Sequence, residues 1–170
     1  LRAYVLKGIV LNDEEKYDDA ISIYLRALEI ATDINDTYNI HICKTNLGWT
    51  YQIIGKYPEA ITFCSEALAD AEKMNNVLSI TENNRCLGLV YMKLGQYNQA
   101  ESYFLNGLDV AKESSLKEEI IDFYQNIIDL YITQGNYKKG LQVSQEFKNH
   151  IDTLNSQEYD RNIVEEKERY

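Results

Sequence analysis

Small and apolar residues recur along this chain at a fixed spacing of 40 positions, and we call positions 40 apart a column. Three columns carry the pattern most clearly: Gly8, Gly48 and Gly88, with Ile128 in the fourth place; Tyr17, Tyr57, Tyr97 and Tyr137; and Ala20, Ala60, Ala100 and Gly140. Repetition at a fixed period indicates a repeat architecture. The sequence therefore predicts four consecutive copies of one structural unit.

Within a unit, the apolar spacing predicts two helices joined by a short turn. In the second unit, apolar side chains recur at helical spacing from about Ile40 to Ile54. Gly55 then supplies the left-handed conformation in which many helices end. The next helix starts at about Tyr57, with Pro58 in its first turn, where a missing N–H costs nothing. No segment shows a strand pattern, so we predict an all-α fold.

The residues between the helices follow the same 40-residue step. Glycine recurs at Gly55, Gly95 and Gly135, with Glu15 as the exception. Polar pairs are expected to close the four units: Asn35-Asp36, Asn75-Asn76, Ser114-Ser115 and Asn155-Ser156. We expect the small residues of the Gly8 and Ala20 columns to lie where the two helices of a unit cross, because larger side chains would push the axes apart.

Charge and cysteine content narrow the function classes. The formal charge of -10 argues against nucleic acid or an anionic membrane surface as the main partner. No apolar run is long enough to span a membrane. The three cysteines, Cys43, Cys64 and Cys86, form no CxxC pair and are expected to be buried thiols, which mildly favours a reducing compartment. Because the chain begins at Leu1 and ends in a charged stretch, we expect it to be part of a longer protein.

The sequence offers no arrangement typical of catalysis. His41 and His150 lie far apart in the repeats and have no paired nucleophile. Phosphate loops, HExxH and GxSxG are missing. Adjacent carboxylates such as Glu118 and Glu119 point in different directions on a helix, so they do not form an acid–base pair. We therefore predict no enzyme activity, no catalytic or metal-binding residues and no cofactor.

Two stretches carry a family resemblance: Asn46-Leu-Gly-Trp-Thr-Tyr51 with Gly55-Lys-Tyr-Pro-Glu-Ala60, and Cys86-Leu-Gly-Leu-Val-Tyr91 with Gly95-Gln-Tyr-Asn-Gln-Ala100. They resemble the tetratricopeptide repeat, whose usual length is about 34 residues. The resemblance implies a right-handed α-solenoid of four helix-turn-helix units, at residues 1–40, 41–80, 81–120 and 121–154. The last unit departs most, with Ile128, Gly140 and Phe147 at positions that are small or alanine elsewhere.

The resemblance also implies a binding surface, because first helices line the concave side of such solenoids. On this basis we expect a protein or extended peptide to contact a set of residues from the second to the fourth unit: Thr45, Asn46, Trp49, Gln52, Glu82, Arg85, Leu89, Asp122, Gln125, Asn126 and Asp129. Trp49 either forms part of an anchor pocket for the ligand or packs between first helices as part of the core. Asn46 and Asn126 either hydrogen-bond the ligand backbone or make local polar contacts.

The charges of this surface bear on the type of ligand. The clamp that grips a C-terminal carboxylate in co-chaperone members would need basic and amide residues at Val5, Ile9, Asn46, Glu82 and Cys86. Only Asn46 fits and Glu82 has the wrong sign, so we do not expect chaperone-tail binding. Asp122 and Asp129 instead favour a ligand with a basic or amine-bearing portion near them.

The segment 155–170 is charged and helix-prone, and its Tyr159, Ile163 and Val164 could form a thin apolar stripe. We expect either a helix that caps the fourth unit or the start of a connector. The segment resembles the end of the tetratricopeptide sensor region of certain bacterial signalling regulators. That resemblance implies a sensory module outside the cytoplasmic membrane; the alternative is a cytoplasmic peptide-responsive regulator or an assembly scaffold. Neither interpretation fixes the oligomeric state, and neither involves direct membrane contact by residues 1–170.

Overall fold

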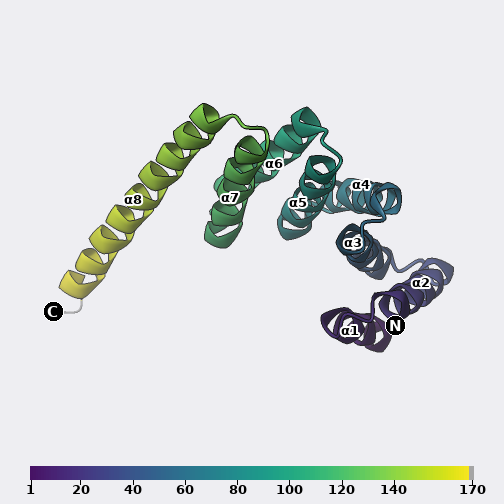
Figure 1. The fold of residues 1–170 in the computed structure, drawn as a ribbon. Helices are drawn as coiled ribbons and strands as arrows, with labels where there is room; N and C mark the ends of the chain where they lie inside the picture. Colours follow the sequence, from purple (N-terminus) through teal and green to yellow (C-terminus); the bar gives the residue numbers. More distant parts are fainter. Residues whose placement is uncertain (169–170) are drawn as a thin grey trace. The chain divides into compact units, whose positions relative to one another are not determined.

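The computed structural model describes the backbone of residues 1–168 and the side chains of residues 1–156. Every element in this range is an α-helix (Figure 1). The helices follow one another in four pairs: α1 (Arg2–Asp13) and α2 (Tyr17–Asp33), α3 (Thr37–Ile53) and α4 (Tyr57–Lys73), α5 (Val77–Lys93) and α6 (Tyr97–Glu113), and α7 (Lys117–Thr133) and α8 (Tyr137–Glu168). The prediction of an all-α fold built from four helix-turn-helix units is confirmed.

The turns have the local chemistry that the sequence predicts. Within the second to fourth pairs, a glycine ends the first helix in the left-handed region, at φ 76° for Gly55 and 72° for Gly95 and Gly135. Between pairs, Asn35, Asn75 and Ser115 take the same role at φ 50–57°. After Asn35 and Asn75, the next residue caps the following helix: Asp36 Oδ1 accepts from the Asn39 amide at 3.0 Å, and Asn76 Oδ1 accepts from the Ser79 amide at 3.3 Å.

The expected break at Asn155-Ser156 is wrong, because α8 runs without interruption from Tyr137 to Glu168. The earlier polar pairs each precede a segment with an apolar face that packs back on the previous helix. The residues after Ser156 are mostly charged, so a reversal there would bury little apolar surface. The side chains of Tyr159, Ile163 and Val164 lie outside the described residues, and so does the expected apolar stripe.

The chain divides into two compact units, residues 1–123 and 124–170, and the boundary falls within α7. In the first unit, each helix from α1 to α6 packs against its neighbour in sequence. In addition, α1 contacts α3 and α3 contacts α5, whereas within residues 1–123 α2 does not contact α4 and α4 does not contact α6. The first helices therefore lie closer together than the second helices, and in this unit they form the inner face.

Glycines of the first helices allow close helix crossing, as the sequence predicts. A Cβ atom at Gly8 would overlap the Tyr24 ring, and one at Gly88 would overlap the Phe104 ring. Tyr24 and Phe104 are fully buried and belong to one column of the second helices. The alanines Ala20, Ala60 and Ala100 are also fully buried. In the second pair, the sulfur of Cys64 occupies the place of the ring over Gly48.

The expectation of three unpaired thiols is wrong for two of the cysteines. The structure joins Cys64 of α4 to Cys86 of α5 in a disulfide, with Cα atoms 6.7 Å apart. Cys43 is free and buried, as expected, and burial raises its pKa to about 11. The pairing escaped the sequence argument because the two residues are 22 positions apart and meet only when α4 and α5 pack together.

The second unit contains the end of α7 together with α8. Its described core includes Ile127, Leu130 and Tyr131, and the rings of Tyr124 and Phe147 stack with centroids 5.0 Å apart. At Gly140 an added Cβ would meet its nearest atom, Tyr131 Cβ, at 3.7 Å, which is ordinary contact. The fourth pair has Ile128 in place of the glycine of the first helix, and its Gly140 is not tightly packed.

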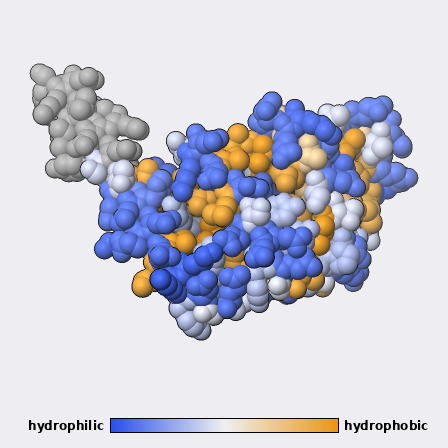
Figure 2. Space-filling model, turned by 90° about the horizontal axis from the view of Figure 1, so that it is seen from above, coloured by the Kyte–Doolittle hydropathy of each residue, from blue (hydrophilic) through white to orange (hydrophobic). Residues whose placement is uncertain are grey.

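The surface is mixed in character. Figure 2 shows polar residues over much of the visible face, with apolar patches between them. Exposed apolar side chains include Leu6 and Val10, each 54% exposed. Among the described residues, no helix is both long enough and apolar enough to cross a membrane.

Candidate functional site

The inner face of the first unit brings together side chains from three successive first helices. Trp49 of α3 is half-buried and packs on a core cluster formed by α4 and α5. The guanidinium carbon of Arg85, on α5, lies 5.2 Å from the centroid of the Trp49 ring. This distance is within the range of a cation–π interaction. Arg85 thus connects an aromatic ring on one repeat with the charged groups of the next.

The other partner of Arg85 lies on α7. The Arg85 Nη1 donates to Asp122 Oδ2, and the side chains are 34% and 45% exposed. Since both remain open to solvent, the pair contributes little to stability. Its main effect is positional, because it holds the guanidinium of Arg85 between Trp49 and Asp122. Trp49, Arg85 and Asp122 all belong to the binding surface predicted from the sequence, and in the structure they lie in one row.

A hollow of about 190 Å³ opens beside this row, between α5 and α7. Carboxylates dominate its lining, which consists of Thr81, Glu82, Arg85, Glu118, Glu119, Asp122 and Phe123. Burial raises the pKa of the Glu82 carboxyl, the Arg85 guanidinium opposes the rise and the Glu119 carboxylate adds to it. Glu82 as a whole is nevertheless an exposed residue, so a ligand can approach it. The hollow is therefore negative, and a cationic group entering it would be favoured.

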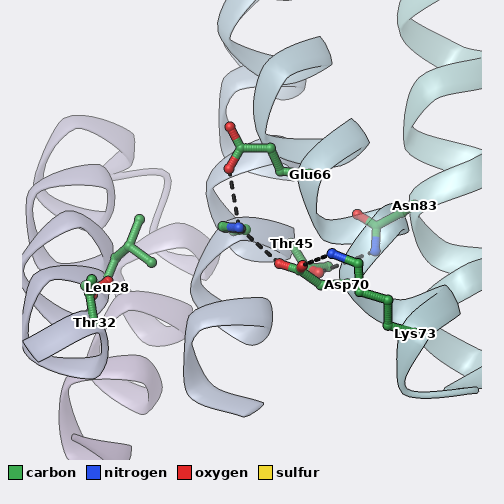
Figure 3. A network of polar contacts seen from close by, with 8 residues as sticks. Leu28, Thr32, Thr45, Glu66, Asp70, Lys73 and Asn83 are labelled. Atoms are coloured by element: carbon green, nitrogen blue, oxygen red, sulfur yellow. Dashed lines mark hydrogen bonds and ion pairs between the residues drawn. The ribbon is translucent and has the colours of Figure 1, made fainter. Parts of the chain in front are cut away.

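Two of the expected residues are engaged within the protein. Thr45 is 7% exposed and accepts a hydrogen bond from the Asn83 amide nitrogen at 3.2 Å (Figure 3). The Asn46 amide nitrogen donates to the carbonyl of Ile42 in its own helix at 2.8 Å. Thr45 thus belongs to the contact between α3 and α5. Asn46 keeps its amide oxygen for another partner.

The remaining expected residues are divided between the two units. Gln52 and Leu89 are half-buried on α3 and α5. Gln125, Asn126 and Asp129 lie on the part of α7 that belongs to the second unit; Gln125 and Asp129 are exposed and Asn126 is half-buried. The structure therefore brings together Trp49, Arg85, Glu82 and Asp122.

Sequence reasoning missed the contribution of Glu118 and Glu119. The family resemblance begins the inward positions of α7 at Asp122, which leaves out its first turn. Both glutamates nonetheless line the hollow. Acidic residues in a first turn also interact favourably with the helix dipole, so their presence alone did not point to a site.

No catalytic arrangement accompanies this surface in the described part of the chain. No group of three or more His, Cys, Asp or Glu side chains there is placed to hold a metal ion. His41 is fully buried, and its pKa is lowered mainly by burial. What the geometry offers is recognition, through an aromatic ring, a fixed guanidinium and an acidic hollow.

Stacked helix pairs with a polar inner face define a helical-repeat protein of the interaction class. The tetratricopeptide repeat family model matches residues 1–73, and a second model of the same repeat matches residues 87–114. The chain belongs to the tetratricopeptide repeat family, whose domains are typically non-catalytic interaction modules. No curated protein matches the sequence.

Solved structures show the same fold at low sequence identity. The tetratricopeptide domain of Arabidopsis FLU is 23% identical, with a TM-score of 0.62 over 69% of this chain and 98% of that domain. BtubC from P. vanneervenii is 18% identical, with a TM-score of 0.78 over 89% of this chain and 63% of that one.

A third similar structure is the Rap conjugation gene regulator of plasmid pLS20 in complex with the Phr* peptide. It is 19% identical, with a TM-score of 0.74 over 86% of this chain. This chain spans 41% of that regulator and 63% of BtubC, less than two thirds of either.

Proposed function

We propose that this chain is a peptide- or protein-binding module whose groove is the inner face formed by α3, α5 and the first part of α7. The single observation that carries the proposal is the row of Trp49, Arg85 and Asp122 beside an acidic hollow. Aromatic and arginine side chains are the residue types enriched at energetic centres of interfaces. Their position on consecutive first helices suits a ligand that extends along the repeats.

The charges of the hollow specify the ligand further. Four carboxylates face one guanidinium, and that guanidinium is already paired with Asp122. A lysine or arginine side chain of the ligand would therefore find Glu82, Glu118 and Glu119 at the hollow. A cationic group would also favour the ionised form of Glu82, whose pKa burial raises. We infer an extended segment with a basic residue placed to reach this hollow.

The wider role that we propose is that of a sensory or interaction region within a larger bacterial signalling protein. The support is the similarity of fold to the Rap regulator, whose structure contains a bound peptide. We also propose that residues 1–154 form the binding repeats and that 155–170 act as a connector, since α8 continues through Asn155-Ser156 without reversing. A cytoplasmic regulator with the same groove is the alternative setting.

The test is a screen of a random peptide library against the purified chain, followed by titration of the selected peptides. We expect basic residues to be enriched, and Glu82→Gln with Glu119→Gln to weaken binding about tenfold or more through loss of charge pairing. The matched control is Glu72→Gln with Glu113→Gln, which removes two exposed carboxylates outside the hollow.

A second pair of variants separates the groove from the core. Trp49→Ala and Asn46→Ala are each measured for peptide affinity and for melting temperature. A lower melting temperature with unchanged affinity would make both residues part of the core and would contradict the proposed groove. Selection of acidic or purely apolar peptides would contradict the assignment of the hollow.

A further inference from the structure

The pair Cys64 and Cys86 joins the second and third helix pairs at a point directly behind the inner face. Cys64 lies on α4 and Cys86 on α5, and both are fully buried. Their cluster also contains Ala60, Leu87 and Val90. Because α4 and α5 belong to different repeats, the bond between the two sulfurs fixes one repeat against the next.

The immediate neighbours of this pair are the residues of the candidate groove. Trp49 packs against the cluster that contains both cysteines. Arg85 directly precedes Cys86 on α5, and its guanidinium lies over the Trp49 ring. A change in the spacing or rotation of α5 against α4 therefore acts on Arg85 through one peptide unit and on Trp49 through direct packing.

Packing around Cys64 leaves little freedom for the sulfur to move away. A Cβ atom at Gly48 would overlap its Sγ and would lie 3.1 Å from its backbone nitrogen. In the first and third pairs, the same position holds the large rings of Tyr24 and Phe104. Cysteine replaces an aromatic ring only in the second pair, and it is there that the neighbouring first helix offers a second cysteine.

We propose that Cys64 and Cys86 form a redox-controlled cross-link that sets the geometry of the Trp49–Arg85 pair, and hence the ligand affinity of the groove. The part concerning affinity rests on the proposed function; the cross-link and its effect on Trp49 do not. On oxidation the two thiols lose two protons and two electrons and one S–S bond forms. The acceptor is a low-molecular-weight disulfide such as glutathione disulfide, which leaves as two thiols.

Burial of the two sulfurs determines how quickly the disulfide forms and breaks. Neither sulfur is reachable from solvent in the closed fold, so exchange requires transient separation of α4 and α5. The cross-link therefore responds slowly to its surroundings and persists once formed. Cys43 is a built-in comparison, since it is equally buried but has no partner cysteine and stays a thiol.

The experiment uses the full chain, equilibrated with an excess of glutathione disulfide or with dithiothreitol. Thiols are then titrated after unfolding in guanidinium, melting is recorded, and Trp49 emission is measured without ligand. We expect about one thiol, that of Cys43, in the oxidised protein and about three in the reduced protein. Reduction should lower the melting temperature by roughly 5–10 °C, because it releases a closed loop of the unfolded chain.

Trp49 supplies a direct readout, since it is the chain's single tryptophan and a nearby disulfide quenches indole emission. Emission should rise on reduction in the wild-type chain and in Cys43→Ala, and should not change in the Cys64→Ala, Cys86→Ala double variant.

Three titratable thiols after oxidation would overturn the cross-link. The same response to dithiothreitol in the double variant and in the wild type would overturn its coupling to Trp49. A peptide affinity that does not depend on redox state, with the other results as expected, would overturn only the part that rests on the proposed function.

Discussion

At the scale of single residues, His41 is the buried polar group least satisfied by its surroundings among the side chains that the structure describes. Its ring is fully buried, and neither ring nitrogen makes a hydrogen bond of good geometry, although the Ala67 carbonyl lies near the ring. Burial lowers the pKa of His41, the Ala67 carbonyl and the Asp70 carboxylate partly oppose this, and Lys44 adds to it. Lys44 and Asp70 themselves pair at 2.8 Å, and both groups act on the His41 ring.

This environment predicts a dependence of stability on pH. The unfolded chain binds a proton at His41 near pH 6.5, and the folded chain binds it only at lower pH. As the pH falls below about 6.5, the free energy of unfolding should therefore fall, by at most about 1.4 kcal/mol per pH unit. The loss should stop once the pH is below the folded-state pKa.

Urea unfolding of the wild type, His41→Leu and His150→Gln between pH 8 and about pH 5 checks this. In His41→Leu, the free energy of unfolding should not show the part of this pH-dependent loss that is due to His41. It should also be about 1 kcal/mol higher than that of the wild type at pH 7, because no unpaired imidazole is then buried. His150→Gln retains His41 and should keep the His41 part of the loss. Parallel curves for the wild type and His41→Leu would contradict the argument.

Glu15 is a second residue in an unfavourable environment. It adopts φ 59° at the position where the later repeats have glycine at φ 72–76°. A side chain in this left-handed region costs about 1 kcal/mol. We expect Glu15→Gly to raise the free energy of unfolding by about 1 kcal/mol, as measured by urea titration. The control is Glu14→Gly at φ -81°, where glycine relieves no strain and should lower stability. Equal effects of the two substitutions would contradict the explanation.

At the scale of elements, Gly88 lies at a helix crossing where the effect of packing on stability opposes the effect of helix propensity. A methyl group at Gly88 would overlap the fully buried ring of Phe104, whereas at Gly140 it would find only ordinary contacts. Gly88→Ala should therefore cost about 1–3 kcal/mol in spite of alanine's higher helix propensity. Gly140→Ala should stabilise the chain by up to about 1 kcal/mol. Thermal melts of the two variants test these stability changes. A stabilising effect of Gly88→Ala would contradict close crossing of the helices at that position.

The same elements show why the sequence predicts the fold better than the site. Each turn is a local event: Gly55 reverses the chain through its own φ angle, and Asp36 caps a helix by accepting a hydrogen bond from the backbone amide of Asn39, three residues further along the chain. Asn155-Ser156 failed as a turn because a polar pair ends a helix only when the following segment has an apolar face to bury.

Whether a side chain faces the candidate site depends on the rotation of its helix as well as on the column to which the residue belongs. Thr45 and Cys86 belong to columns assigned to the inner face, yet both are buried, one bonded to Asn83 and the other to Cys64. A small rotation of a helix about its axis decides which side of it faces the groove, and a 40-residue period does not encode that rotation. Glu118 reaches the hollow from the first turn of α7, outside the assigned columns.

At the scale of the whole molecule, the excess of negative charge is the dominant long-range term. The chain has 27 Asp and Glu against 17 Lys and Arg. Several of its ion pairs are surface pairs, such as Lys16 with Glu14 at 57% and 50% exposure, and such pairs contribute little. In the hollow, Glu119 raises the pKa of Glu82, which is a local sign of the same repulsion.

Screening of this repulsion should therefore stabilise the protein. As the NaCl concentration rises from about 0.02 M to about 0.3 M, the Debye length falls from about 20 Å to about 6 Å, so interactions between distant surface charges are screened. We expect the melting temperature to rise by about 2–4 °C, equivalent to about 1 kcal/mol for a chain of this length. Choline chloride at equal ionic strength should give the same rise, because screening does not depend on which cation supplies it. A larger rise with sodium would indicate cation binding, and a fall with both salts would mean that the ion pairs outweigh the net repulsion.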